Sequence, residues 1–294
     1  MRLGFHTNAF VWAGVTDIVA IARWAAEQGF DFLEVGPGIE LDRSRFEAAA
    51  AFVDLDSFIY CRNFIADDAA AAESERAELL RRMKFAASIG AKRIIISTGI
   101  SARRSTLPSG SNDPLKRLEV ASLFLEEVLA TAKTLALEVC IENCPMYRNI
   151  ATSPLMWRSL FDRVDDDGLK LCYDPSHFVW QMIDVYKPLV EFGERITHIH
   201  VKDTWLDPKK LGDVGILHNT GGERGFEENQ WWRHTVIGDG EIDWKYFFAL
   251  VGTLPDNDVH LSFEMEDYQW EGEEERVKQG LALQMQRIRP LIGM

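Results

Sequence analysis

The sequence lacks several features that would assign it to a membrane, secreted or nucleic-acid-binding class. No apolar run reaches the roughly twenty residues that a membrane-spanning helix needs, so we expect no membrane span. Four cysteines are present and no two form a CxxC pair, which is unlike a disulfide framework. Basic residues number 32 against 46 acidic ones, and the net charge of −14 opposes attraction to a phosphate backbone. We therefore expect neither a membrane nor a nucleic acid as a partner.

The first residues also lack the marks of a secretory signal and of a dinucleotide-binding loop. Residues 1–6 have neither the charged nor the apolar zone of a signal peptide and are typical of a strand, so we expect a cytoplasmic protein. Residues 5–10 contain no glycine, whereas an open doubly wound sheet usually has a glycine-rich phosphate loop after its first strand. The open sheet is therefore only the second choice of architecture.

What the sequence does contain is a regular alternation of short β-rich runs and longer helical stretches. We expect Thr16 to cap a helix that ends before Gly29, Pro114 to open a long helix, and Asp243 to precede another. Eight such alternations, without a linker, predict one (β/α)₈ TIM barrel domain over residues 1–294. The strands are expected to end near His6, Glu34, Arg62, Ser97, Glu142, Asp174, Lys202 and Glu264.

The interval of residues 204–240 is longer than the others and is rich in glycine. We expect it to form an extended loop over the barrel mouth after the seventh strand, because long loops at that place are usually lids or binding loops. It contains a Trp231-Trp232 pair.

Four of the expected strands end in a group that can hold a divalent metal: Glu142, Asp174, His200 and Glu264. In a parallel α/β protein the carboxyl ends of the strands meet, so these groups would surround one point. Taken singly, Glu142 fits a salt-bridged strand end and Asp174, which precedes a proline, fits a turn. Together they form a mixed oxygen and nitrogen set that suits Mn²⁺, Mg²⁺, Co²⁺ or Zn²⁺.

Alternation along the seventh and eighth strands places further polar groups beside this set. His198 and His200 point to the same side of their strand, with Lys202 two residues further on. A lone histidine is more often a hydrogen-bonded core residue than a ligand, but two on one interior face favour a site. Glu264 and Glu266 likewise share a face, and Glu266 could pair with a basic neighbour.

The ordered motifs resemble those of a known superfamily. They read Ile-Glu-Asn, Asp-Pro-Ser-His, His-Ile-His-Val-Lys-Asp, Gly-Asp-Gly-Glu-Ile-Asp-Trp and Phe-Glu-Met-Glu-Asp. Their succession is similar to that of the xylose isomerase-like TIM barrel superfamily of sugar isomerases and epimerases, which includes ketose 3-epimerases and inosose dehydratases. The resemblance extends over essentially the whole chain and is not specific to one substrate.

The resemblance implies roles for individual residues. Glu142, Asp174, His200 and Glu264 fall on the metal-binding positions, and Glu142 with Glu264 also matches the two carboxylates that exchange protons with the substrate. His177 matches a histidine that faces the substrate. Arg233 matches an arginine that points into the pocket.

Three departures from the family pattern leave the substrate open. The loop before Gly238 is longer than in the compact epimerases. Ile237 stands where a proline is common, and Met265 stands where several relatives have histidine.

The expected chemistry follows from these groups. A metal on the carbonyl and hydroxyl oxygens of a sugar stabilises an enediolate, while two carboxylates remove a proton from one face and return one to the other. We expect an isomerase or epimerase of a ketose or related polyhydroxy carbonyl compound, with one divalent metal, Mn²⁺ first and Co²⁺, Mg²⁺ or Zn²⁺ next. The alternative is an inosose dehydratase or keto-sugar lyase, in which His177 or Lys202 would assist the leaving group.

Other residues near the expected mouth could bind the substrate. We expect contacts from His6, Trp12 and Lys202, and an apolar wall for the sugar from Trp12, Phe10 and the Trp231-Trp232 pair; ordinary core or loop aromatics are the alternative. Arg62 could bind a polar substrate or be a surface charge, and Arg103-Arg104 fits a solvated loop better than a phosphate site.

Two other classes compete with a sugar enzyme. An apurinic endonuclease would need additional histidine ligands and a basic surface, and a non-catalytic sugar-binding protein would not depend on Glu142. A homo-oligomer is possible through apolar residues of the closing helix, which could instead face the barrel: Leu281, Leu283, Met285 and Ile288.

Overall fold

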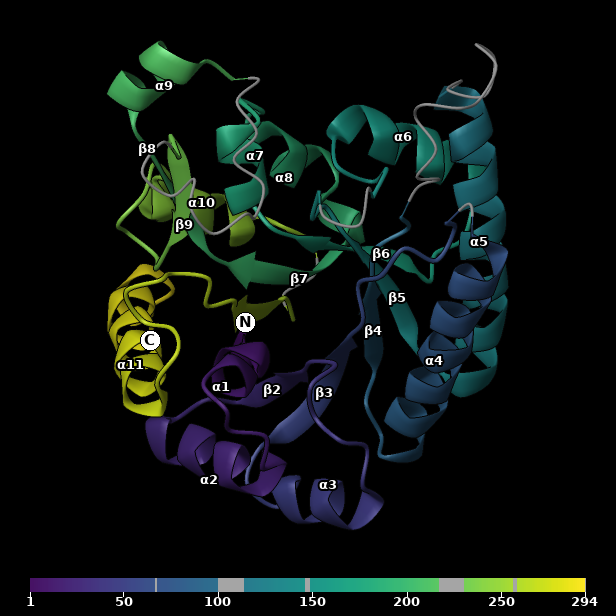
Figure 1. Cartoon of the computed structure of the whole chain (residues 1–294), viewed down its shortest axis with the longest axis horizontal. Coiled ribbons are helices and arrows are strands. Elements are labelled where there is room, and N and C mark those ends of the chain that lie inside the picture. The colour runs from purple at the N-terminus through teal and green to yellow at the C-terminus, as the bar shows by residue number, and fades with distance from the viewer. Residues whose placement is uncertain (67, 100–113, 146–148, 217–229, 256–257, 294) are drawn as a thin grey trace.

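Eight parallel strands close into a barrel with helices around it (Figure 1). The computed structural model describes residues 1–66, 68–99, 114–145, 149–216, 230–255 and 258–293. Neighbouring strands follow the chain order, and the last closes against the first, which confirms the (β/α)₈ prediction and rules out the open sheet. The barrel strands are β1 (Arg2–His6), β2 (Phe32–Val35), β3 (Asp54–Ile59), β4 (Arg93–Ile96), β5 (Glu138–Glu142), β6 (Leu169–Tyr173), β7 (Ile196–Val201) and β10 (His260–Phe263).

The strand ends agree with the expected positions except at β3. That strand ends at Ile59, before Arg62, whose guanidinium turns back over the ring of Tyr60 at 4.8 Å and donates to the carbonyl of Cys61. The registers of β1 with β2 and of β5 with β6 place His6 opposite Glu34 and Glu142 opposite Cys172. In-register pairing of parallel strands therefore collects the strand-end side chains at one end of the barrel.

The helices begin and end where the local sequence can satisfy their free backbone groups. Asp17, not Thr16, caps α2, because its carboxylate accepts from the backbone N–H groups of Val19 and Ala20. Gly29 ends α2 in the left-handed region with φ +80°. The α-helices are α1 (Asn8–Trp12), α2 (Ile18–Gln28), α3 (Arg43–Ala49), α4 (Ala69–Ser88), α5 (Pro114–Leu135), α6 (Pro154–Arg163), α7 (Ser176–Trp180), α8 (Lys187–Glu191), α9 (Pro208–Val214), α10 (Trp244–Val251) and α11 (Glu274–Ile288), with the 3₁₀ turns η2 (Gly193–Arg195) and η4 (Arg289–Leu291).

The main hydrophobic core lies between the strands and the helices. In the closing helix α11, Leu281, Met285 and Ile288 are buried in this core, so they face the barrel and offer no free surface for a partner. A second, smaller cluster consists of Ile59, Ile95, Cys140 and Cys172. Among the helices that the structure describes, none has the length and apolar character needed to cross a membrane.

The long interval after β7 contains regular structure, which corrects the loop prediction. β8 (Asp203–Leu206) pairs antiparallel with β9 (Trp232–Thr235), and α9 follows β8; residues 217–229 lie outside the described part. In Figure 1 this hairpin lies next to α7 and α10. The two strands are separated by more than twenty residues, so no local pattern in the sequence showed that they pair.

Asp203 fixes the segment that follows the hairpin. Its carboxylate accepts hydrogen bonds from the indole of Trp244 at 2.7 Å and from the backbone N–H groups of Gly238 at 3.1 Å and Ile242 at 3.2 Å. A Cβ at Gly240 would lie 2.3 Å from this carboxylate, so glycine is needed there. Asp203 of the Lys-Asp motif is thus in direct contact with both glycines of the Gly-Asp-Gly motif, Gly238 and Gly240.

Candidate metal centre

The carboxyl ends of β5, β6, β7 and β10 bring the four predicted ligands together. The Nδ1 atom of His200 lies 3.1 Å from Oε1 of Glu142, 3.2 Å from Oε2 of Glu264 and 3.9 Å from Oδ2 of Asp174. Glu142 ends β5, while Asp174 and Glu264 directly follow β6 and β10. All four side chains are buried, so one enclosed cluster of three carboxylates and one imidazole results.

His177 joins the same cluster from α7. Its Nε2 atom lies 3.3 Å from Oδ2 of Asp174 and 3.8 Å from Oε1 of Glu142. The other oxygen of Asp174 accepts from the backbone N–H of Ser176 at 2.8 Å, which holds the start of α7 against the end of β6. One ligand atom from each of Glu142, Asp174, His177 and Glu264 lies within 4.8 Å of the others. The histidine expected to face the substrate thus lies directly at this carboxylate cluster.

Lys202 places a positive charge against these carboxylates. Its Nζ atom lies 2.6 Å from Oε2 of Glu264, 2.6 Å from Oε2 of Glu266 and 3.1 Å from Oδ2 of Asp174. Burial alone would lower the pKa of Lys202, but the three carboxylates raise it well above its usual value. Three carboxylates thus surround the ammonium group of Lys202, whose side chain is 1% exposed.

The two glutamates expected to exchange protons have different surroundings. Burial raises the pKa of Glu142, against the effect of His200, and the Cys61 thiol donates to its Oε2 at 3.2 Å. Burial would also raise the pKa of Glu264, but Lys202 and His200 hold it well below its usual value. Two carboxylates in one site with pKa values pushed apart are the pattern of an acid and base pair.

The donor set fits a divalent cation. Three clustered carboxylates and an imidazole are hard and borderline donors of the kind that Mn²⁺, Mg²⁺, Co²⁺ and Zn²⁺ accept. Within the described residues, neither ring nitrogen of His6 or of His177 has a hydrogen-bond partner, although both rings are buried. Buried polar atoms without a partner are costly, so an ion or a bound molecule at this place would satisfy them.

The sequence of residues 22–287 matches the family model described as xylose isomerase-like TIM barrel. The chain belongs to this family. Members of the same fold among solved structures include the IOLI protein with a binding zinc atom (TM-score 0.73, 14% identity, covering 99% of this chain and 98% of that chain). The probable 3-DHS dehydratase AsbF from Bacillus anthracis has a TM-score of 0.71 at 14% identity and covers 98% of both chains.

The chain is also similar to one further solved structure and to one curated protein. D-psicose 3-epimerase with D-tagatose from Clostridium cellulolyticum H10 has a TM-score of 0.72 at 14% identity and covers 99% of both chains. The uncharacterized protein YfiH of Bacillus subtilis (strain 168) is 32% identical over 102 residues, 34% of this chain and 31% of the relative. The chain thus matches about a third of that curated relative's length, and the likeness to the solved structures shows the fold alone.

The hairpin places Arg233 and His234 on opposite faces of β9, as alternation along a strand requires. The guanidinium of Arg233 lies over the rings of Trp205 at 4.4 Å and Tyr268 at 5.3 Å. His234 lies beside the carboxylate cluster, with its Nε2 3.8 Å from Glu266 and its ring 5.2 Å from that of His177. The sequence did not indicate His234, because residues 232–235 were predicted to lie in a loop. Side chains alternate between two faces only in a strand.

The other residues expected to bind the substrate lie in different places, beside the cluster, on the surface or in the core. His6 lies beside the cluster, with Nδ1 3.6 Å from Oε1 of Glu264, and Trp12 is 49% exposed at the end of α1. Phe10 is buried against Phe5 and Trp24, so its assignment to a sugar-binding wall is wrong. Trp231 is also buried.

Trp232 has different neighbours from Trp231. Its ring stacks on that of Trp180 at 4.7 Å and lies 5.1 Å from the ring of His234. The aromatic surface beside the cluster therefore comes from β9 and α7. Arg103-Arg104 lies outside the described residues.

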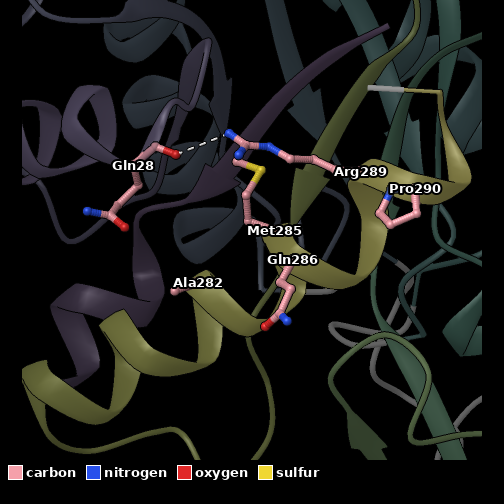
Figure 2. Close-up of a pocket in the computed structure, with 6 residues that line it drawn as sticks. All are labelled: Gln28, Ala282, Met285, Gln286, Arg289 and Pro290. Carbon is pink, nitrogen blue, oxygen red and sulfur yellow. Dashed lines mark hydrogen bonds between the residues drawn. The ribbon is translucent and has the colours of Figure 1, made fainter.

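A hollow of about 350 Å³ lies elsewhere on the barrel, between α2 and the end of α11 (Figure 2). Arg289 donates across it to the carbonyl of Gln28 at 3.4 Å. Since Gln28 ends α2 just before β2 begins, this hollow is at the amino end of the barrel strands, away from the metal cluster. None of the predicted site residues lines it.

Proposed function

We propose that this chain is a divalent-metal-dependent isomerase or epimerase of a ketose or related polyhydroxy carbonyl compound. The observation that carries the proposal is the convergence of Glu142, Asp174, His200 and Glu264 at one barrel end, with His177 beside them. Membership of the xylose isomerase-like family and the fold shared with a D-psicose 3-epimerase support it.

In this proposal a bound divalent cation, held by Glu142, Asp174, His200 and Glu264, would polarise the substrate carbonyl as a Lewis acid. Glu142 and Glu264 have carboxylate oxygens 3.1 and 3.2 Å from the same His200 nitrogen, so both border one small space. One carboxylate would take the proton from the carbon next to the carbonyl, and the other would return a proton. His177 and His234, with Trp232, would orient the hydroxyl groups and the C–H face of the sugar.

The test combines removal of metal with exchange of solvent deuterium into a panel of free and phosphorylated ketoses. We expect chelation to abolish exchange, and Mn²⁺ or Co²⁺ to restore it more fully than Mg²⁺ or Zn²⁺. Glu142→Gln and Glu264→Gln should each lower the exchange rate by about 10²–10⁴-fold. Glu138→Gln, the same change on β5 outside the cluster, is the matched control and should leave exchange unchanged. Full exchange after complete removal of the metal would refute the proposal.

Dehydration of a keto-sugar or keto-inositol is the second candidate. It is favoured by Lys202, whose ammonium group lies within 3.1 Å of three carboxylates and could help a hydroxyl to leave, and by the shared fold with a probable 3-DHS dehydratase. Loss of one water from the product, measured by mass spectrometry, separates this reaction from epimerisation, which conserves mass.

A further inference from the structure

Glu34 is a buried carboxylate that the proposed chemistry does not use. It lies in β2, and its two oxygens face two histidines of β7 across the barrel. Oε2 lies 2.6 Å from Nε2 of His198, while Oε1 and Oε2 lie 3.1 and 3.2 Å from Nε2 of His200. All three side chains have an exposed fraction of 0%, so no solvent competes for these hydrogen bonds.

The two ring nitrogens of His200 face different partners. Nδ1 points at the carboxylates of Glu142 and Glu264, and Nε2 points at Glu34. A metal-ligating nitrogen carries no proton, so a neutral His200 that binds through Nδ1 must carry its proton on Nε2. Glu34 can accept that proton in a hydrogen bond, which selects this tautomer and fixes the plane of the ring.

His198 restrains Glu34 in turn. It lies on the same face of β7 as His200, and its ring packs against Phe32 at 6.0 Å and His260 at 6.2 Å. Its Nε2 lies 2.6 Å from Oε2 of Glu34. One carboxylate thus receives two imidazole donors, and neither histidine can turn without breaking a hydrogen bond to it.

We propose that Glu34 is a positioning residue of the metal centre, which holds His200 with Nδ1 toward the metal, and that His198 fixes Glu34. The inference rests on the proposed metal centre and adds a part that the family motifs did not mark. Partners of this kind behind a ligating histidine typically change metal affinity by about 10–100-fold when they are mutated.

The experiment uses metal binding rather than turnover. Zn²⁺ affinity is measured by competition with a chelating dye, and the site geometry by the visible absorption of the Co²⁺-loaded protein. We expect Glu34→Gln to weaken Zn²⁺ binding by about 10–100-fold and to change the Co²⁺ spectrum, because the amide is neutral and has an NH₂ donor in place of one of the two accepting oxygens. Glu34→Asp, which keeps the charge, should recover part of the affinity. Glu138→Gln is the matched control and should bind as the wild type does.

Different results refute the two proposals. If the wild type binds no divalent metal, the metal-dependent function fails. If it binds, and Glu34→Gln shows the same affinity and the same Co²⁺ spectrum, the positioning role fails and the metal centre stands. Should Glu34→Gln not fold, as seen by circular dichroism, His198→Asn decides in its place: unchanged affinity and spectrum would refute the inference. Nitrogen-15 spectra of the histidine rings must also show the proton of His200 on Nε2.

Discussion

At the scale of single residues, the direction in which a side chain points decides its role. The convergence of Glu142, Asp174, His200 and Glu264 could be predicted because each lies at or next to the end of a run whose strand character is clear from the sequence alone. His234 could not, because its strand is recognised only through its pairing with Asp203–Leu206. The role of Glu34 was also hidden, since its partners His198 and His200 are more than 160 residues away in the chain.

Lys202 permits a prediction about charge at this scale. Lys202→Met keeps the length of the side chain but leaves two buried carboxylates, Asp174 and Glu264, and the half-buried Glu266 without their cation. We expect the metal-free protein to lose about 3–5 kcal/mol of unfolding free energy, as when one partner of a buried ion pair is removed. Urea denaturation measures the loss, and saturating Mn²⁺ or Zn²⁺ should restore part of it.

The matched control for Lys202→Met is Lys133→Met. Lys133 pairs with Asp166 at 2.7 Å on the surface, with its side chain 66% exposed. An exposed pair contributes about 0–1 kcal/mol, so this variant should be nearly as stable as the wild type. Equal effects of the two variants would show that the charge of Lys202 is not balanced by the cluster.

At the scale of elements, local sequence predicted the barrel units and non-local contacts decided the rest. Asp243 and Pro114 begin α10 and α5 as expected, because capping and the fixed φ of proline depend only on near neighbours. The N-cap of α2 is Asp17 and not the predicted Thr16, a difference of one residue, and both residue types cap helices well. The β8–β9 hairpin was missed because the contacts that fix it come from Asp203 and the segment around Gly240.

Gly240 provides a test of that contact. A Cβ at this position would lie 2.3 Å from Oδ1 of Asp203 and 2.5 Å from the carbonyl oxygen of Thr204. We expect Gly240→Ala to lower the unfolding free energy by about 1–3 kcal/mol, because the backbone oxygen cannot move without displacing β8. Thermal denaturation followed by circular dichroism measures the change.

Gly212→Ala is the control for this substitution. Gly212 lies inside α9, and a Cβ there would meet nothing within 4 Å. The higher helix propensity of alanine should leave stability unchanged or raise it by up to about 1 kcal/mol. A Gly240→Ala protein as stable as Gly212→Ala would show that the Lys-Asp and Gly-Asp-Gly segments are not in the close contact described.

At the scale of the whole molecule, barrel closure explains why the convergence of the four strand-end groups could be predicted and the substrate could not. Eight parallel strands in a closed barrel must bring their carboxyl ends together, so four strand-end groups meet whatever the helices do. The side chains around the cluster come instead from α7 and the β8–β9 hairpin, whose positions follow from individual contacts such as the Trp180–Trp232 stack. No periodic pattern encodes those contacts.

Since the proposed ligands Glu142, Asp174, His200 and Glu264 lie at the ends of four different strands, metal binding should stabilise the barrel as a unit. A ligand that binds only the folded state at about 100 times its Kd adds about 2.7 kcal/mol to the unfolding free energy. We therefore expect Mn²⁺, Co²⁺ or Zn²⁺ to raise the Tm in a concentration-dependent way, measured by calorimetry after complete chelation. Glu138→Gln should keep the shift, and Asp174→Asn should lose most of it, because Asp174 contributes its Oδ2 to the cluster. A Tm independent of every divalent cation would mean that the four strand-end groups are held together by Lys202 and their hydrogen bonds alone.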